Sequence, residues 1–411
     1  MTKRKKNILY IEANAELAGP QYCLLDLIDH LDKKRFQPIV LLNTDGPLVQ
    51  LLTSRGISVK VIRVIFPFSK MFSPSAFRHN WKAWSETIKF INTHKVDIIH
   101  CQSALSLKIL LPSLYRYRAR IVQQCDDLYN ASSLSFKVCM IFGANTLVAV
   151  CNAVHEKAIS GIPTLRKRAV RIYNSVNIDT FRPSKKTVRL RKEWGVPKSS
   201  TLIGLVANFA PVKDHVTFLK AVRLLQQDTM RTHFLLVGGV FQPDLYPDHV
   251  TYKSLVESYI VSNGLSDRVL LTGHRDDMAD VFRSLDILVI SSITEGCNRA
   301  ILESMASGTP VIATNSGGTP ELIEHERTGL LFEPRDARGL AKSIRRLSND
   351  KKLYTRLRRN ALEEVRKRFR PDTRARKFED KYLEVLSRIS PSTSTVENVA
   401  SGKQLQELRA Q

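Results

Sequence analysis

The chain has 411 residues, of which 43% are hydrophobic and 25% are charged, and its formal net charge is +24. This composition excludes a wholly disordered or collagen-like chain, and the length predicts two or three domains. A protein this basic usually meets an acidic partner, such as nucleic acid, an anionic membrane surface or a phosphorylated substrate, and charge alone does not choose among them.

Neither the apolar segments nor the cysteines indicate secretion, a membrane span or a metal site. The first apolar run stops at Glu12, which is too early for a signal peptide. The most apolar window, 138–151, is shorter than the roughly 20 residues that a bilayer requires. The six cysteines lack metal-ligand spacing. We therefore expect reduced thiols in a cytoplasmic protein, with no metal and no zinc site.

Short runs of Val, Ile and Leu alternate with amphipathic helical stretches along the chain. Uninterrupted apolar runs predict strands covered on both faces, hence parallel sheets. The repeated βαβ pattern predicts an α/β protein with two Rossmann-like, doubly wound domains that face a central cleft. The expected strands are 8–11, 38–42, 59–64, 97–100, 120–123, 146–150, 170–172, 201–206, 233–237, 269–271, 287–290 and 310–313.

Composition shifts predict the domain boundaries. The first domain spans 1–174, a polar linker spans 175–200, and the second domain spans 201–370. Pro371 is expected to interrupt a long charged helical region, so that a separate helix covers about 371–389. The Ser- and Thr-rich tail, 390–411, is predicted to be disordered.

Because ligands bind beyond the carboxyl ends of parallel strands, the loops after the strands are candidate sites. Gly19 and Pro20 open a helix after the first strand and leave its first N–H groups free, although an ordinary turn explains them equally well. Lys213 follows the first strand of the second domain at a predicted helix start. It is a plausible diphosphate ligand, but a solvated lysine is the commoner reading of one lysine alone.

Two acidic residues and two glycines follow later strands. Glu295 precedes a predicted helix and Glu303 lies eight residues on, which puts them on roughly one face. Glu303 has apolar neighbours and needs a partner such as a sugar or ribose hydroxyl, unless it faces solvent. Gly317 and Gly318 allow close backbone approach at a helix start that can hold a phosphate.

The order and spacing of these motifs, together with Glu321 and the run 328–330, resemble a retaining glycosyltransferase of family 4, also called group 1, with the GT-B fold. The resemblance covers roughly 7–389 and is strongest over 201–332. It implies a nucleoside-diphosphate sugar bound mainly by the second domain, no obligatory metal or cofactor, and final helices that cross back to the first domain.

The resemblance also implies roles for individual residues. Lys213 matches the basic residue that contacts the diphosphate, Glu303 the acid that holds the ribose, and Glu295 the acid beside the transferred sugar. Four further positions match backbone contacts: the N-terminal loop glycine that faces the diphosphate, and donors near the sugar and its phosphate. These positions are Gly19, Gly296, Cys297 and Asn298.

Two positions depart from the family pattern. Asn208 stands where the family often has an arginine, and we hypothesise that Arg299 partly replaces that charge at the diphosphate. Cys125 stands where the family often has a histidine near the transferred sugar. We expect Asp126 or Asp127 to take over that role, and we count Asp126 with Glu295 and Lys213 as a candidate catalytic residue.

The expected reaction is retaining transfer of a sugar to a hydroxyl of a glycan or lipid-linked acceptor, in the synthesis of cell-surface polysaccharide or lipopolysaccharide. The alternatives are a polyanion- or nucleic-acid-binding protein on the same scaffold, or a GT-B epimerase or phosphorylase. The Glu-x7-Glu spacing favours the transferase. No recognised nucleic-acid motif is present, so no nucleic-acid partner is expected.

The positive charge is concentrated. Residues 1–6 carry net +4, residues 165–193 net +8 and residues 335–390 net +11, so the rest is nearly neutral. This distribution favours a peripheral contact with an anionic membrane surface at its inner face, although solvated helix faces explain it about as well. The aromatic loop 66–72 is a second candidate for contact with lipid, or packs on its own domain.

Overall fold

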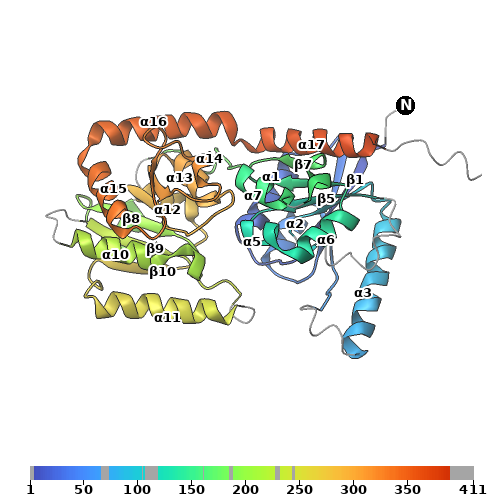
Figure 1. The fold of residues 1–411 in the computed structure, drawn as a ribbon, viewed down its shortest axis with the longest axis horizontal. Coiled ribbons are helices and arrows are strands. Elements are labelled where there is room, and N and C mark those ends of the chain that lie inside the picture. The colour runs from blue at the N-terminus through green and yellow to red at the C-terminus, as the bar shows by residue number, and fades with distance from the viewer. Residues whose placement is uncertain are drawn as a thin grey trace, which may run out of the picture.

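The computed structural model describes residues 4–65, 74–103, 105–106, 119–160, 162–184, 188–226, 232–242 and 246–388. The chain forms two α/β domains that lie side by side, with two long helices running along one edge of both (Figure 1). The predicted disordered tail and the aromatic loop 66–72 lie outside the described residues.

The N-terminal domain contains a seven-stranded sheet in the order β3-β2-β1-β4-β5-β6-β7. Every pairing is parallel, as the unbroken apolar runs predicted. Its strands are β1 (Lys6–Glu12), β2 (Phe36–Leu42), β3 (Ser58–Val61), β4 (Ile98–Cys101), β5 (Arg120–Cys125), β6 (Thr146–Ala149) and β7 (Ala169–Arg171). Its helices are α1 (Gly19–His30), α2 (Pro47–Ser54), α3 (Pro74–Thr93), α5 (Leu128–Ser132), α6 (Leu134–Gly143), α7 (Asn152–Ile159) and α8 (Pro163–Arg166).

The C-terminal domain contains a six-stranded parallel sheet in the order β10-β9-β8-β11-β12-β13. Its strands are β8 (Thr201–Val206), β9 (Thr232–Val237), β10 (Val269–Gly273), β11 (Ile287–Ile290), β12 (Val311–Thr314) and β13 (Leu330–Phe332). Its helical elements are the 3-10 turn η3 (Pro211–Lys213), α10 (His215–Leu225), α11 (Pro247–Ser262), α12 (Met278–Ser284), α13 (Arg299–Ser307), α14 (Thr319–Leu322), α15 (Ala337–Asn349) and α16 (Lys351–Arg368).

The last helix returns to the N-terminal domain. Helix α16 covers the C-terminal domain and ends at Arg368. After two non-helical residues, Phe369 and Arg370, helix α17 (Pro371–Ser387) packs on α1 (Figure 1). Pro371 stands at the first position of α17, where its fixed φ suits a helix and its missing N–H costs nothing. The predicted helix break at this proline is confirmed.

Two elements differ from the sequence-based expectation. Strand β13 was not predicted, because a short apolar run directly after a turn residue such as Gly329 is ambiguous in the sequence. The predicted linker contains helix α9 (Val188–Glu193), which packs on α12 of the C-terminal domain. Buried Arg191 of α9 donates to the carbonyl oxygens of Ser284 and Ser200, so this helix belongs structurally to that domain.

Both strand orders reverse at one point, between β1 and β4 and between β8 and β11. At such a switch point, the loops leave the carboxyl ends of the two strands in opposite directions and open a crevice. In the C-terminal domain, this switch point lies at the loops that follow β8 and β11. In the N-terminal domain, it lies beside Glu12, the last residue of β1.

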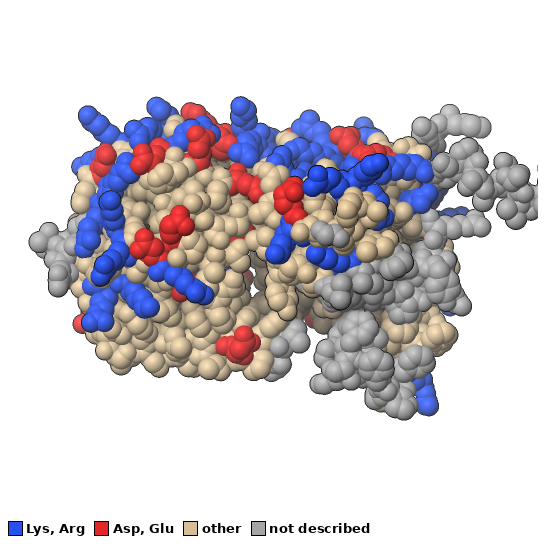
Figure 2. All heavy atoms as spheres, viewed as in Figure 1, with Lys and Arg blue, Asp and Glu red and all other residues tan. Residues whose placement is uncertain are grey.

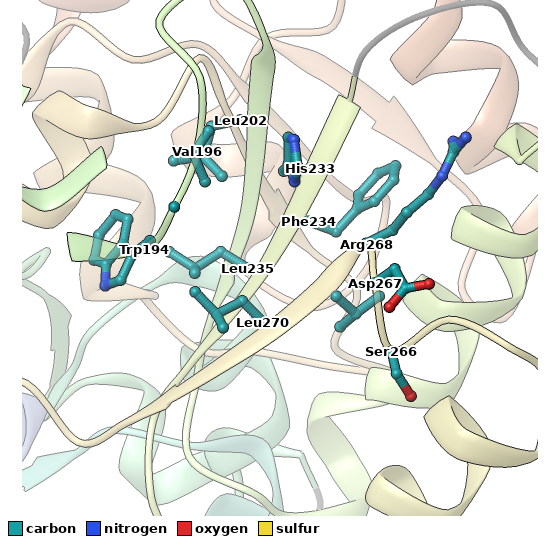
Figure 3. A pocket seen from close by; sticks show the side chains of 12 residues that line it. Trp194, Val196, Leu202, His233, Phe234, Leu235, Ser266, Asp267, Arg268 and Leu270 are labelled. Atoms are coloured by element: carbon teal, nitrogen blue, oxygen red, sulfur yellow. The ribbon is translucent and has the colours of Figure 1, made fainter. Parts of the chain in front are cut away.

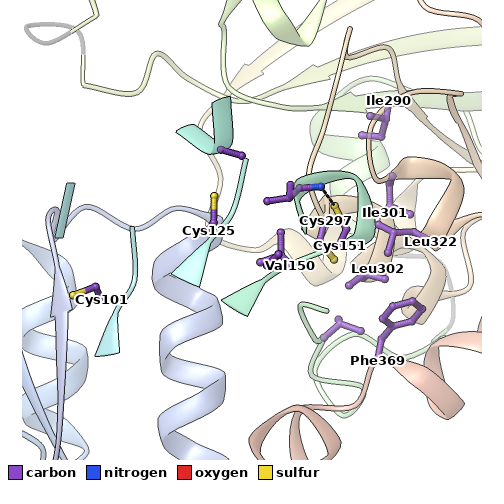
Figure 4. Close-up of a cluster of buried hydrophobic side chains, with 14 of the residues drawn as sticks. Cys101, Cys125, Val150, Cys151, Ile290, Cys297, Ile301, Leu302, Leu322 and Phe369 are labelled. Atoms are coloured by element: carbon purple, nitrogen blue, oxygen red, sulfur yellow. Dashed lines mark hydrogen bonds between the residues drawn. The ribbon is translucent and has the colours of Figure 1, made fainter. Parts of the chain in front are cut away.

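One hydrophobic core continues across the two domains. Cys151 and Val150 of the N-terminal domain belong to the same buried cluster as Cys297, Ile301 and Leu302 of the C-terminal domain (Figure 4). Phe369, between α16 and α17, also belongs to it. Removing these side chains from water stabilises the contact between the domains.

Candidate functional site

The loops after β8 and β11 are bound to each other at the C-terminal switch point. Ser291 Oγ, just after β11, donates to the carbonyl oxygens of Lys213 and Asp214 at 3.0 and 2.9 Å. The Ile293 N–H donates to the Val212 carbonyl at 2.8 Å. These bonds hold the loop that carries Lys213 beside the loop that carries Glu295.

Lys213 and Glu295 form an ion pair at the centre of this arrangement. The distance from Lys213 Nζ to Glu295 Oε1 is 2.7 Å, and Ser292 Oγ donates to the same oxygen at 2.6 Å. The lysine side chain is 21% exposed and the glutamate side chain 11%, so the pair lies at the edge of the protein surface. The structure thus brings together the cation and the first acid that the sequence singled out.

The helix start near Lys213 is shifted from its expected place. Lys213 ends the 3-10 turn η3, and α10 begins two residues later at His215. Asp214, with a left-handed φ of 48°, caps α10 by accepting from the Thr217 N–H. Lys213 therefore approaches the site from a turn and not from the first turn of an α-helix.

Glu303 faces a different partner from Glu295. Helix α13 begins at Arg299, capped by the Asn298 side chain, so Glu295 lies in the preceding loop and Glu303 in the second turn. Loop geometry, not helix periodicity, sets the relation of the two acids. Arg299 Nε donates to Glu303 Oε1 at 2.6 Å. Burial raises the pKa of Glu303, and the charge of Arg299 opposes that rise.

Arg299 is held between the two domains. Its Nη1 donates to Asp26 Oδ2 of α1 at 2.7 Å while its Nε holds Glu303. The guanidinium charge is thus balanced by a carboxylate from each domain. Its expected contact with the diphosphate stays a prediction.

The predicted phosphate-site glycines lie against protein backbone. A Cβ on Gly296 would lie 2.1 Å from the Asp126 carbonyl oxygen of the other domain. A Cβ on Gly317 would lie 2.2 Å from the Glu295 carbonyl oxygen, and one on Gly318 would lie 2.1 Å from that of Gly296. The Gly318 N–H donates to the Glu295 carbonyl. Close loop packing therefore explains these glycines, and their contacts with a donor stay predictions.

Glu321, beside these glycines, binds the start of α7 across the domain interface. Its carboxylate accepts from the N–H groups of Asn152 and Ala153 at 2.8 and 2.9 Å, and from Tyr173 Oη at 2.8 Å. A carboxylate is favourable at a helix N-terminus, because unpaired N–H groups and the helix dipole both attract it. Nearby, Asn174 Nδ2 donates to the Cys297 carbonyl at 3.1 Å.

The predicted glycine of the N-terminal domain has open space beside it. Gly19 is the first residue of α1, and a Cβ built on it would meet no atom within 4 Å. This contrasts with the three glycines of the C-terminal loops. The position therefore has room for a ligand group near the first N–H groups of α1.

Two carboxyl groups with raised pKa values lie at the carboxyl ends of β1 and β5. Burial, opposed in part by hydrogen bonds, raises the pKa of Glu12 to about 7 and that of Asp126 to about 7. Gln124 Nε2 donates to Asp126 Oδ1 at 2.8 Å. Cys125 is buried, and burial raises its pKa well above the ordinary value, so its thiol stays neutral. Asp126 thus remains the candidate for proton exchange at this point.

Sequence reasoning missed Glu12 and a glycine pair after β9. In the sequence, Glu12 only marks the end of an apolar run, but its Oε2 is buried without a hydrogen-bond partner among the described residues. Gly238 has a φ of 149°, and a Cβ there would lie 1.9 Å from the Ala207 carbonyl oxygen. It therefore packs beside half-buried Asn208 in the loop after β8. Two glycines directly after a buried strand were the available signal.

A surface cavity elsewhere is distinct from this site. It measures about 140 Å³ and is lined by Trp194, His233, Arg268 and neighbours (Figure 3). His233 is the second residue of β9 and Val269 is the first residue of β10, so the cavity lies at the amino ends of these strands. Ligands of parallel sheets bind at the opposite ends. In Figure 2, the surface is hollowed between the two domains.

Within the described ranges, no three His, Cys, Asp or Glu side chains gather where they could hold a metal ion. No helix in the same part of the chain combines the length and apolar character that crossing a membrane demands.

Two family models match adjacent parts of the chain. The model described as glycosyl transferases group 1 matches residues 187–364, and the model for glycosyltransferase family 4 matches residues 18–180. Together they cover both domains.

Named relatives cover the chain to different extents. An N-acetyl-α-D-glucosaminyl L-malate synthase of Bacillus anthracis is 31% identical over 48% of this chain, a match that spans 49% of that protein. A UDP-Gal:α-D-GlcNAc-diphosphoundecaprenol α-1,3-galactosyltransferase of Escherichia coli is 23% identical over 94% of this chain and 98% of its own.

Solved structures share the fold. Anabaena HepE in complex with UDP-glucose aligns with a TM-score of 0.79 at 22% identity, over 92% of this chain and 99% of its own. A sucrose-phosphate synthase of Thermosynechococcus elongatus aligns with a TM-score of 0.77 at 19% identity, over 93% of this chain and 100% of its own. This likeness identifies the architecture as GT-B, the two parallel-sheet domains that the sequence predicted.

Proposed function

The chain belongs to the group 1 glycosyltransferases of family 4, and on that premise we propose that it transfers a sugar, with retention, from a nucleoside-diphosphate sugar to an acceptor hydroxyl. The observation that carries this proposal is the pairing of Lys213 with Glu295 at the switch point of the C-terminal sheet. A cation at this point suits a diphosphate, and an acid beside it suits sugar hydroxyls.

In the proposed step, the bond between the sugar anomeric carbon and the diphosphate oxygen breaks. The acceptor oxygen forms its bond to the same face of the sugar, and its proton passes to the departing phosphate oxygen. Lys213 and the amino end of α13 stabilise the negative charge of the leaving group. Glu295 orients the sugar, and Glu303 binds the ribose.

A UDP-sugar donor and a glycan or lipid-linked acceptor are the substrates that we propose. The Anabaena structure contains UDP-glucose, and the Escherichia coli relative acts on a diphosphoundecaprenol-linked sugar. Both span nearly all of this chain. We place the reaction in the synthesis of cell-surface polysaccharide or lipopolysaccharide.

The direct test incubates the protein with UDP-, GDP- and ADP-sugars and measures release of the nucleoside diphosphate with and without acceptor extracts. We expect release from one donor class, with the α-configured product from an α-configured donor. We also expect activity to survive EDTA, because Lys213 supplies the positive charge. Binding of DNA without binding of any nucleotide sugar contradicts the proposal. An epimerised sugar as the product would identify an epimerase instead. Sugar release that requires inorganic phosphate would identify a phosphorylase.

We also propose that the enzyme works at an anionic membrane surface. Figure 2 shows Lys and Arg side chains gathered along the edge formed by α16 and α17. On α16, Lys352, Arg356 and Arg359 are exposed and spaced four and three residues apart, so they share a face. Each well-placed basic residue contributes about 1 kcal/mol of attraction to an anionic leaflet.

Vesicle flotation tests this contact. We expect flotation with vesicles containing anionic lipid and little with neutral vesicles. The triple variant Lys352→Gln, Arg356→Gln, Arg359→Gln should bind about 100-fold more weakly, the equivalent of about 3 kcal/mol. The matched control neutralises exposed Lys33, Lys34 and Lys82 of the N-terminal domain. Equal flotation with both kinds of vesicle contradicts the proposal.

A further inference from the structure

A buried chain of three charged residues connects the domains beside the candidate donor site. Arg299 Nη1 donates to Asp26 Oδ2 at 2.7 Å, and Arg299 Nε donates to Glu303 Oε1 at 2.6 Å. The three side chains are only 11–14% exposed. Asp26 lies on α1 of the N-terminal domain, whereas Arg299 and Glu303 lie on α13 of the C-terminal domain.

The surface of α1 encloses the guanidinium. The Tyr22 ring lies 5.4 Å from the Arg299 Cζ, and Cys23 Sγ lies 3.7 Å from its Nη1. A buried guanidinium needs its charge and its fork of donors satisfied in defined directions. Asp26 therefore fixes the side of Arg299 that points away from Glu303.

The geometry leaves part of Glu303 available. Its Oε1 accepts from Arg299, and among the described residues its Oε2 has no hydrogen-bond partner. Without Asp26, the guanidinium can turn and take both carboxylate oxygens in a bidentate pair. That arrangement would remove an acceptor that a ribose hydroxyl needs.

We propose that Asp26 is a positioning residue for donor binding: through Arg299 it fixes the Glu303 carboxylate, so that nucleoside-diphosphate affinity depends on α1 being docked against α13. The inference rests on the proposed function, in which Glu303 binds the ribose. It gives Asp26 of the N-terminal domain an influence on nucleotide affinity without a direct contact between Asp26 and the nucleotide.

Titration calorimetry with UDP tests this proposal on the full chain. We expect Asp26→Asn to weaken UDP binding about tenfold, and Asp26→Glu, which retains the charge, to recover part of that loss. In the reaction, the KM for the donor should rise while kcat at saturating donor changes little. Asp29→Asn is the control, because Asp29 lies on the same helix but pairs with Arg55 of its own domain.

A double-mutant cycle separates positioning from general stabilisation. If Asp26 acts through Glu303, Asp26→Asn should add little to the loss already caused by Glu303→Gln. Full additivity, or wild-type UDP affinity in a folded Asp26→Asn variant, overturns the inference. If the wild-type protein binds none of UDP, ADP and GDP, the proposed function itself fails and this inference fails with it.

Discussion

The pairing of Lys213 with Glu295 has a chemical consequence at the scale of single residues. In the structure, the ammonium group is neutralised by a carboxylate 2.7 Å away. In the proposed function, a donor diphosphate, with more negative charge than one carboxylate, would compete for the same cation. Glu295 holds the lysine in place in the structure, and in the proposed function its carboxylate would turn to the sugar hydroxyls once the donor has bound.

Replacing Lys213 tests its part in charge stabilisation. We expect Lys213→Ala to lower kcat by about 10²–10³, the usual cost of losing one donor that stabilises developing negative charge. Steady-state kinetics, with the donor found in the test of UDP-, GDP- and ADP-sugars, measure the change in kcat. The control is Lys220→Ala, an exposed lysine of α10, which should retain wild-type kinetics. Equal kinetics for the two variants would remove Lys213 from the mechanism.

The carboxyl groups of Glu12 and Asp126 predict a pH dependence of stability. Each has its pKa raised to about 7 in the folded protein, whereas both ionise near pH 4 when unfolded. The folded state therefore binds more protons between about pH 4 and 7. These two groups lower the free energy of unfolding as pH rises through that range.

Asp126→Asn should make this decline shallower, because the amide does not titrate. Urea unfolding at pH 5 and pH 7.5 measures the difference. Asp380→Asn, at an exposed position of α17, is the control and should leave the decline as it is in the wild type. A decline as steep in Asp126→Asn as in the wild type would contradict the assignment.

At the scale of elements, α17 joins the C-terminal end of the chain to the first sheet. Buried Arg374 donates to the Cys23 carbonyl at 2.7 Å and to Gln124 Oε1 at 3.3 Å. The hydroxyl group of Tyr382 lies 2.6 Å from His100 Nδ1 on β4. Helix α17 thus packs against β5, the strand that leads to Asp126.

Removing a core side chain of α17 tests how strongly it anchors the fold. Phe378 is fully buried, and its ring centroid lies 5.0 Å from that of His100. We expect Phe378→Ala to lower the free energy of unfolding by about 3–5 kcal/mol. Exposed Lys377→Ala should change it by less than about 0.5 kcal/mol. Urea denaturation measures both, and equal midpoints would show that α17 contributes little.

At the scale of the whole molecule, the two domains meet through backbone as well as side chains. Gly296 lies against the Asp126 carbonyl, Glu321 binds the start of α7, and Asn174 binds the Cys297 carbonyl. Gly296 and Cys297 are candidate site residues themselves, and Glu321 lies on α14, three residues after Gly318. A change in the angle between the domains must therefore move the site.

Gly296→Ala tests this coupling. A Cβ there would lie 2.1 Å from a backbone oxygen of the other domain, so the domains must separate or tilt to accept it. We expect a lower melting temperature and a larger radius of gyration in small-angle scattering. Gly19→Ala should leave both unchanged, because its Cβ would meet no atom within 4 Å. An unaltered melting temperature in Gly296→Ala would contradict the tight interface.

Local patterns in the sequence predicted much of the architecture. Apolar runs without alternation, such as 287–290, predicted parallel sheets, and Pro371 predicted the break before the last helix. The order and spacing of Lys213, the Glu295–Glu303 pair and the later glycine motifs indicated the family, which the family models confirm. These features could be read because strand burial, proline geometry and motif spacing are properties of short segments.

Contacts between distant segments were decided only by the tertiary structure. The sequence around Arg299 does not predict its contact with Asp26, 273 positions away. The sequence around Gly296 does not predict its contact with the carbonyl of Asp126. The raised pKa of Glu12 likewise depends on burial by elements that are remote in sequence. Charge balance, desolvation and steric fit depend on which surfaces meet, and the packing of the two domains determines that.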